Sequence, residues 1–240
     1  MRAVVLAGGR GTRLRPYTVV LPKPLMPVGD RPVLDIVVRQ LRRAGCERLT
    51  IATGYLAELI EAFFRDGRSY EVAIDYFRET HPLGTAGSLA LIDGLDEPFL
   101  VMNGDVLTDI DYRQMLADHA GSDAIATIAS RQHQVEISLG VLHFGGDEQD
   151  PSRLSAYEEK PRISYEASMG VYCFSPRVIE HIGRGEHIDF PDLILRLIAA
   201  GETVRAWHSD AYWLDIGRHD DYEQAQEEFE RLRPRLLPDE

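Results

Sequence analysis

The chain has 240 residues, of which 44% are hydrophobic and 27% charged, and these ordinary fractions exclude a disordered or fibrous protein. A net charge of −13 excludes a non-specific nucleic-acid or anionic-membrane binder, because such partners attract basic proteins. No apolar run approaches the ~20 residues that cross a bilayer, and the start of the chain lacks the apolar length of a signal peptide. We therefore expect a cytoplasmic protein.

The first half of the chain alternates between short apolar runs and amphipathic segments. Residues 2–7 form an apolar run that predicts a strand buried on both faces, and a loop rich in Gly, Arg and Pro follows it to about residue 31. We expect further strands at 48–53, 72–77 and 99–102, and helices from Pro32 to about Gly45, at 56–64, at 84–92 and at 112–119. This alternation predicts an α/β fold with a parallel sheet flanked by helices.

The second half contains more strands. Its pattern predicts strands at 124–129, 139–144, 153–158, 169–174, 204–207 and 212–215. Helical segments are expected at 176–182 and 191–200, with a last helix from about His219 to Leu232. Residues 145–151 (GGDEQDP) have the composition of a solvated turn and not of a domain linker.

Basic residues gather at the N-terminus of this acidic chain. The first 29 residues contain no acid and carry Arg2, Arg10, Arg13, Arg15 and Lys23. This distribution suggests a site for a small polyanion, although a chance run of surface arginines would give the same charge count.

A glycine loop, LAGGRGTRLRP, follows the first strand directly. It fits neither the Rossmann pattern G-x-G-x-x-G nor the P-loop pattern, which ends in Lys-Ser or Lys-Thr. Its three glycines still allow backbone N–H groups to approach an anion closely, so the loop can hold a triphosphate. The alternative is a tight turn with solvated arginines.

The longer string, LAGGRGTRLRPYT at 6–18 followed by PKP at 22–24, resembles the signature of the sugar-1-phosphate nucleotidyltransferases, also called nucleotide-sugar pyrophosphorylases. Four further motifs match in the family's order: PLGTAGSL at 82–89, MNGDVL at 102–107, EEKP at 158–161 and WLDIG at 213–217. The form of PLGTAG is typical of mannose-1-phosphate guanylyltransferases.

The resemblance implies a Rossmann-like, mostly parallel mixed sheet flanked by helices, of the glycosyltransferase-A type. It also implies one domain over residues 1–240, with a nucleotide-binding part at about 1–120 and a sugar-phosphate-binding part at about 121–240. Family members with a C-terminal β-helix domain are longer, so we do not expect that domain here.

The reaction that this resemblance implies is NTP + sugar 1-phosphate ⇌ NDP-sugar + pyrophosphate, with small-molecule substrates and Mg²⁺ as cofactor. The attacking phosphate is already ionised near neutral pH, so no general base is expected. By motif, Arg13 and Lys23 are the catalytic residues, and Asp105 and Asp215 are the metal ligands, since Mg²⁺ takes one or two carboxylates plus phosphate oxygens. The residues expected to bind the nucleotide are Leu6, Ala7, Gly8, Gly9, Gly11, Thr12, Glu79, Pro82, Gly84, Thr85, Asn103 and Gly104. Those expected to bind the sugar phosphate are Gly140, Glu159, Lys160, Ser168 and Gly170.

Lysine usage supports two of these assignments independently. Lys23 and Lys160 are the only lysines among the 26 basic residues, and both precede proline at positions where the family has functional lysines. A sequence that otherwise uses arginine has kept a compact ammonium at these two places.

Base and sugar are predicted less directly. Glu79 stands where enzymes specific for uracil or thymine nucleotides usually carry glutamine, and a carboxylate suits the adjacent N–H donors of guanine. This favours GTP, with a mannose- or heptose-like sugar phosphate. The alternatives are a uridylyl-, thymidylyl- or cytidylyltransferase acting on glucose 1-phosphate or a related phosphate, and a weakly catalytic nucleotide-sugar-binding regulatory subunit. A homodimer is possible, and no nucleic acid or membrane partner is expected.

Overall fold

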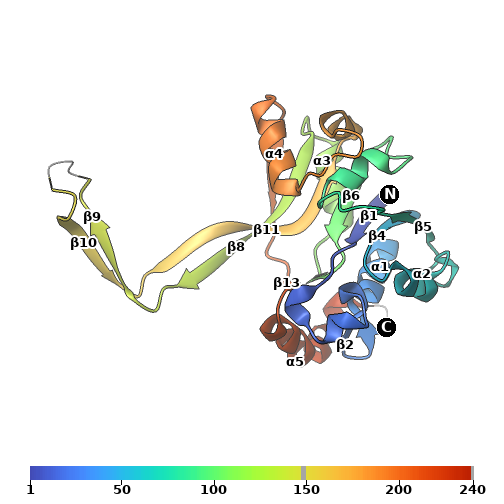
Figure 1. The fold of residues 1–240 in the computed structure, drawn as a ribbon, viewed down its shortest axis with the longest axis horizontal. Coiled ribbons are helices and arrows are strands. Elements are labelled where there is room, and N and C mark those ends of the chain that lie inside the picture. Colours follow the sequence, from blue (N-terminus) through green and yellow to red (C-terminus); the bar gives the residue numbers. More distant parts are fainter. Residues whose placement is uncertain (147–149, 239–240) are drawn as a thin grey trace.

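The computed structural model describes residues 1–146 and 150–238, and a seven-stranded sheet lies at its centre (Figure 1). The strand order is β12-β8-β11-β6-β1-β4-β5. The strands are β1 (Arg2–Ala7), β4 (Arg48–Thr53), β5 (Ala73–Arg78), β6 (Phe99–Asn103), β8 (Ala126–Glu136), β11 (Arg162–Phe174) and β12 (Val204–His208).

The N-terminal half of the sheet is parallel. β1 pairs in parallel with β4 on one side and with β6 on the other, and β4 pairs in parallel with β5. Val4 and Val5 in β1 are fully buried, as expected for a strand covered on both faces. The carboxyl ends of these strands therefore meet at one edge of the sheet, where open α/β sheets bind ligands.

The C-terminal half makes the sheet mixed. β11 runs antiparallel to both β6 and β8, and β12 runs parallel to β8. The predicted α/β class with a mostly parallel mixed sheet is confirmed.

Helices cover both faces of the sheet. One buried cluster joins the sheet to α1 (Val33–Arg43), α2 (Ala57–Phe64) and α3 (Tyr112–Ala120), and a second joins it to α4 (Phe190–Ala199). The helix that the sequence predicts at 84–92 is instead a short 3-10 turn at Gly87–Leu91. Gly84 has a φ of +73°, and a Cβ at Gly87 would lie 2.2 Å from the Glu186 carbonyl oxygen, so close packing prevents a full helix here.

A third buried cluster lies below the carboxyl edge of the sheet. It joins the C-terminal helix α5 (His219–Leu236) to the small strands β2 (Pro27–Val28), β7 (Val106–Thr108) and β13 (Trp213–Asp215), while β3 (Arg31–Pro32) pairs with β2. In the part of the chain that the structure describes, no helix combines the length and apolarity needed to cross a bilayer.

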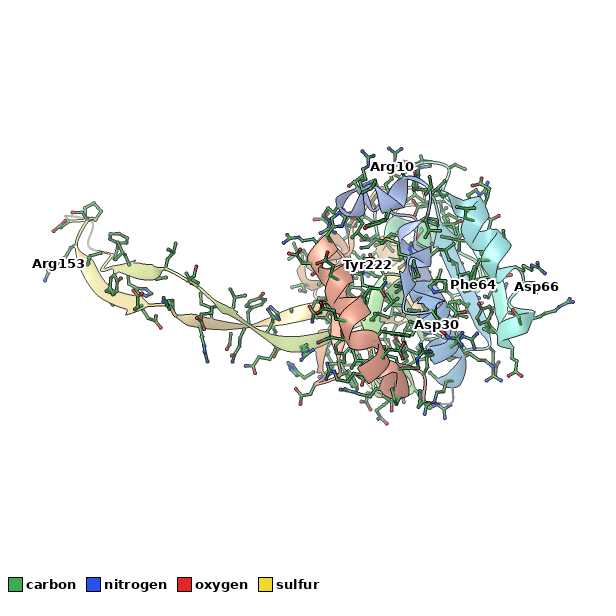
Figure 2. All side chains as sticks on the ribbon, turned by 90° about the horizontal axis from the view of Figure 1, so that it is seen from below. Arg10, Asp30, Phe64, Asp66, Arg153 and Tyr222 are labelled. Atoms are coloured by element: carbon green, nitrogen blue, oxygen red, sulfur yellow. The ribbon has the colours of Figure 1, made fainter. Side chains whose placement is uncertain are left out.

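Two of the central strands continue far beyond the sheet. The sequence predicts strands at 124–129 and 169–174, but β8 extends to Glu136 and β11 begins at Arg162. Together with the hairpin of β9 (Gly140–Phe144) and β10 (Leu154–Glu159), they form a two-stranded ribbon, residues 131–146 and 150–167, which we call the arm. Figures 1 and 2 show the arm projecting away from the rest of the protein. Part of the turn predicted at 145–151, residues 147–149, lies outside the described residues.

Candidate active site

The glycine loop leaves the carboxyl end of β1 and returns over it through three 3-10 turns. Gly11 has a φ of +57°, which glycine adopts without strain, and a Cβ there would lie 2.9 Å from Thr18 Cγ2. The Thr18 hydroxyl donates a hydrogen bond to the Gly11 carbonyl at 2.7 Å. No heavy atom of the described chain lies within 4 Å of the position that a Cβ on Gly9 would take, so this glycine faces open space.

Lys23 and two carboxylates meet beside this loop. Asp105 lies between β6 and β7, and Asp215 ends β13, which pairs with β7 so that Asp215 stands opposite Val106. The Lys23 ammonium donates a short hydrogen bond to Asp105 Oδ2 and lies 3.9 Å from Asp215 Oδ1. The Lys23 side chain is only 10% exposed, so the fold holds its charge between the two acids.

Electrostatics connect a fourth charged residue to this cluster. Burial raises the pKa of Asp215, and repulsion by the Asp105 carboxylate adds to the rise. The positive charges of Lys23 and Arg13 oppose it, which places both cations within the field of Asp215. A Cβ at Gly217 would lie 3.4 Å from Arg13 Nη1, so this glycine leaves room for the guanidinium. The structure therefore brings together all four predicted catalytic and metal-binding residues.

The donor set of this cluster fits a magnesium ion. Two carboxylates that repel each other across a partly buried space are what a divalent cation neutralises, and Mg²⁺ usually takes one or two carboxylates with phosphate oxygens and water. Among the described residues no group of three or more His, Cys, Asp or Glu side chains could hold a metal ion. The substrate's phosphates would have to complete the coordination of Mg²⁺ at Asp105 and Asp215.

The neighbouring acids Asp109 and Asp111 have other roles. Asp111 caps α3 by accepting a hydrogen bond from the Gln114 backbone N–H at 2.9 Å. Asp109 accepts from the Tyr212 N–H at 2.7 Å and pairs with Arg235 at 2.6 Å. Both are used within the fold, so neither competes with Asp105 and Asp215 for a metal ion beside Lys23.

Glu79 follows β5 at the same edge of the sheet. Its backbone N–H donates to the Thr53 carbonyl at 2.9 Å, and its carboxylate lies 3.7 Å from the position of a Cβ on Gly8. Burial raises the pKa of Glu79, while a hydrogen bond from the Leu83 backbone lowers it. A half-buried acceptor therefore stands next to the first glycine of the loop.

The other residues predicted for the nucleotide lie around this edge. Leu6 and Ala7 end β1, Thr12 opens the first 3-10 turn, and the Gly104 N–H donates to the Leu6 carbonyl at 2.9 Å. Pro82 is exposed at the start of the PLGTAG segment.

Thr85 forms hydrogen bonds within the protein through both its backbone and its side chain. Its N–H donates to Asp189 Oδ1 and its hydroxyl accepts from the Phe190 N–H, both at 2.8 Å, at the start of α4. Its contact with a nucleotide stays a prediction.

The residues predicted for the sugar phosphate fall into two groups. Ser168 and Gly170 lie at the base of the arm, where the Gly170 N–H donates to Ser168 Oγ at 3.3 Å. A Cβ at Gly170 would lie 2.7 Å from Asn103 Nδ2, so this pair stands close to the end of β6 and to Asp105.

The second group lies on the arm. Gly140 pairs with Glu159 across β9 and β10, and a Cβ at Gly140 would overlap the Tyr157 hydroxyl at 2.1 Å. Lys160 follows with a φ of 49°, at the bend between the inner and outer halves of the arm. The structure does not bring Gly140, Glu159 and Lys160 together with Lys23, because they lie at the bend of the arm, from which β9 and β10 project further away from the sheet (Figure 1).

Three residues that support the loop escaped the sequence analysis. Thr18 closes the turn at Gly11, Gly217 makes room for Arg13, and Asp221 accepts hydrogen bonds from the Gly217 and Arg218 N–H groups at 3.1 and 2.7 Å. Asp221 could have been found as an acid three residues into the last helix, a common capping position.

Together, the glycine loop and the cluster of two cations and two acids at the carboxyl edge of the sheet define an α/β protein whose site has the charges and backbone N–H groups that suit a polyphosphate. The profile of the nucleotidyl transferase family matches residues 2–231, so the chain belongs to that family.

Curated relatives have names with different nucleotides and sugars. The chain is 35% identical, over 94% of its length, to a UTP–glucose-1-phosphate uridylyltransferase of Synechocystis sp.. It is 34% identical to a mannose-1-phosphate guanyltransferase of Yarrowia lipolytica and 33% identical to a mannose-1-phosphate guanylyltransferase of Mycobacterium tuberculosis, over 92% of its length in each case. The chain spans 62% of the length of each of these three relatives.

Solved structures share the fold. HddC from Yersinia pseudotuberculosis, complexed with GMP-PN, superposes with a TM-score of 0.69 at 25% identity and covers 95% of this chain and 99% of its own. A UDP-glucose pyrophosphorylase complexed with UDP-glucose gives a TM-score of 0.69 at 24% identity, with 97% and 99% covered.

Proposed function

We propose that this protein is a magnesium-dependent sugar-1-phosphate nucleotidyltransferase. The observation that carries the proposal is the position of Lys23 between Asp105 and Asp215, with Arg13 beside them, at the end of a glycine loop. Two cations and a metal seat at one point are what the meeting of two anionic substrates requires, because catalysis must offset their repulsion.

The chemistry is an in-line displacement at the α-phosphorus of the nucleotide. A phosphate oxygen of the sugar 1-phosphate forms the new P–O bond, and the bond to pyrophosphate breaks, so atoms and charge balance without a proton transfer. The loop's N–H groups orient the triphosphate, and Lys23 and Arg13 stabilise the charge that develops on the equatorial oxygens. When bound at Asp105 and Asp215, Mg²⁺ would supply further charge neutralisation of the phosphates.

Guanine is the base that Glu79 favours. A carboxylate only accepts hydrogen bonds, so it pairs with the N1–H and N2–H₂ donors of guanine and repels the carbonyl groups of uracil. The position of Glu79 beside Gly8 supports contact with a nucleotide on the loop. The relatives named as guanylyltransferases and HddC in complex with GMP-PN agree with this choice, whereas the Synechocystis relative favours UTP as the alternative.

For the sugar, we propose mannose 1-phosphate or a heptose phosphate. Support comes from the guanylyltransferase relatives and the PLGTAG form of the nucleotide segment. Ser168 at the base of the arm would contact a sugar hydroxyl from a short side chain.

The test is a pyrophosphate-release assay with Mg²⁺, each of the common NTPs and a panel of sugar 1-phosphates. We expect turnover with GTP and mannose or heptose phosphate. Turnover at least tenfold faster with UTP or dTTP would overturn the assignment of the base. Nucleotide-sugar binding without turnover in any pair would show a regulatory binding protein instead.

The metal assignment has its own test. Asp105→Asn removes one negative charge without changing the size of the side chain, and we expect turnover to fall by about a hundredfold or more. Asp111→Asn is the matched control, because asparagine also caps helices well and Asp111 lies on α3. Melting curves of both variants separate a lost ligand from a lost fold, and a near-normal rate for Asp105→Asn would refute its role.

A further inference from the structure

The inner half of the arm has one apolar and one polar face. Val135 in β8 stands opposite Ile163 in β11, and His133 stands opposite Tyr165 with their rings 5.4 Å apart. Side chains of a strand alternate between faces, so these four share one side of the ribbon. The alternate residues on the other side are polar: Gln132, Gln134, Glu136, Arg162, Ser164 and Glu166.

The outer half of the arm also has a face of large apolar side chains, opposite a face that mixes Val141 and Ala156 with polar residues. Leu142 pairs with Tyr157, and Phe144 with Leu154, so apolar side chains again stand on one face of β9 and β10. On the opposite face His143 lies 3.7 Å from Glu158. Leu142, Phe144, Leu154 and Tyr157 are all exposed.

This pattern is typical of antiparallel sheets that cover a core on one side, yet nothing in the described chain covers the arm's apolar face. Val135 is 41% exposed and Ile163 is 49% exposed. Contiguous apolar patches of this kind mark interaction surfaces, and an isolated two-stranded ribbon has little stability of its own. Figure 2 shows Arg153 near the tip of the arm, well away from Arg10 on the glycine loop.

The body carries a matching apolar patch beside the candidate active site. Tyr17, Val19 and Val20 are exposed on the loop between Arg15 and Lys23, and Val20 is 74% exposed. The protein's own arm lies away from this loop in both views (Figures 1 and 2).

Besides its uncovered apolar face, the arm carries a lysine, Lys160, that lacks an ion pair within the described chain. It makes no ion pair with any residue that the structure describes, although it is exposed and follows the acids Glu158 and Glu159. In the body, Lys23 is already paired with Asp105, so a second phosphorylated substrate would benefit from one more cation.

We infer that the arm docks on the body of a second copy of this chain and carries Glu159 and Lys160 to that copy's sugar-phosphate site. The exchange is two-fold, so each active site consists of one body and the partner's arm. The inference rests on the proposed function for the chemistry at the site, but the docking itself rests on the arm's shape and apolar face.

The hydrogen-bonded ladder favours a second copy over the arm's own body. The pairing of β8 with β11 runs without interruption from Arg131 and Ala167 to Glu136 and Arg162, and the Ile137 N–H continues it to the Pro161 carbonyl at 3.0 Å. The register shift in this pairing lies at the base of the arm, between Ser168 and Tyr172, and beyond it the arm is directed away from its own loop (Figure 1). A standard interface needs roughly 20–30 residues a side, and the described residues of the arm, 131–146 and 150–167, suffice for that number.

The first experiment measures mass in solution. We expect light scattering or sedimentation of the full chain to give twice the chain mass of 27.0 kDa. Val135→Lys with Ile163→Glu places a cross-strand ion pair on the apolar face and should yield monomers. Gln134→Lys with Ser164→Glu is the matched control on the polar face, one residue along the same ladder, and should stay dimeric.

The second experiment tests the shared site by mixing two variants, Lys23→Ala and Lys160→Ala, at a low concentration of sugar 1-phosphate. Each alone should be impaired, but the body of the second and the arm of the first form one intact site in a mixed dimer. With free exchange of subunits, about a quarter of wild-type activity should return.

The outcomes separate the two proposals. A monomeric wild type, a dimer whose mass the apolar-face variant does not change, or active wild type with no recovery on mixing would each overturn exchange of arms. Failure of wild type to react with any substrate pair would instead overturn the proposed function, and the mass measurements would still decide the docking.

Discussion

Lysine and arginine carry the same charge, but position 23 distinguishes them. The Lys23 ammonium reaches Asp105 and Asp215 from a side chain that is nearly buried, so the space between the carboxylates fits a compact cation. A guanidinium is planar and larger, and its five donors lie in a fixed fork.

We therefore expect Lys23→Arg to lower turnover by about a hundredfold, nearly as much as Lys23→Ala, since the charge is kept but misplaced. Steady-state pyrophosphate release measures the loss. Arg10→Lys is the control, because Arg10 is exposed on the same loop and this substitution is the reverse of Lys23→Arg. Lys23→Arg with wild-type turnover would show that only the charge at position 23 matters.

At the same scale, we expect the Glu79 side chain to select the base of the nucleotide. Glu79→Gln replaces a pure acceptor by an amide that also donates, so it should lower kcat/KM for GTP by tenfold or more, at a cost of about 1.5–3 kcal/mol for one hydrogen bond to a charged group. The ratio of GTP to UTP turnover should fall with it. An unchanged ratio in the same assay would remove Glu79 from base recognition.

At the scale of elements, the segment before α4 holds the PLGTAG turn in place. The Ile188 carbonyl lies 2.4 Å from the position of a Cβ on Gly84, and Glu186 ties this segment to α4 through two hydrogen bonds from Arg196 at 2.6 and 2.9 Å. The Gly183 N–H donates to the same carboxylate at 2.8 Å. The hydrogen bonds from Arg196 first, and then that from Gly183, lower the pKa of Glu186 to about 2.

A lowered carboxyl pKa stabilises the folded state above the unfolded pKa, and this stability is lost as the pH falls towards the folded pKa. For Glu186 the window runs from the ordinary value of 4.5 down to about 2. Glu186→Gln should therefore lower the melting temperature at about pH 7, and its difference from wild type should shrink at about pH 3. Calorimetry at both pH values measures this. Glu180→Gln, exposed on the preceding turn, should show no such pH dependence, and a constant difference for Glu186→Gln would contradict the linkage.

At the scale of the whole molecule, the C-terminal helix holds the site together. Phe229 in α5 is 1% exposed and shares a buried cluster with Leu14 and Met26 from the glycine loop and with Leu214 and Ile216 on either side of Asp215. Arg13 and Asp215 are thus each adjacent in sequence to an apolar residue of the cluster that contains α5. Gly29 reinforces this docking, because a Cβ there would lie 2.3 Å from the Phe229 ring.

Phe229→Ala should lower the free energy of unfolding by about 3–5 kcal/mol, as expected for a large buried ring. Because the same cluster positions Arg13 and Asp215, turnover should fall at temperatures where the variant is still folded. Denaturant unfolding and activity measured together check this. Glu227→Ala, exposed on the same helix, is the control and should change neither. Full activity in folded Phe229→Ala would separate the cluster from the site.

The sequence by itself determined the sheet-and-helix alternation, the strand at Arg48–Thr53 to the residue, and the set of charged residues that meet at the loop. These follow from local periodicity and from motifs that lie at the ends of buried strands. It did not reveal β7, whose three residues Val106–Thr108 are too few to show a period.

Only the tertiary structure decided which predicted residues lie together. Asp105 and Asp215 are neighbours because β7 pairs with β13, a contact between segments more than a hundred residues apart that no local pattern encodes. The direction of the arm is likewise set by the tertiary structure. The sequence predicts strands in its outer half, at 139–144 and 153–158, but not at 131–136 and 162–167, and where its apolar face is directed depends on how β8 and β11 extend beyond the rest of the sheet.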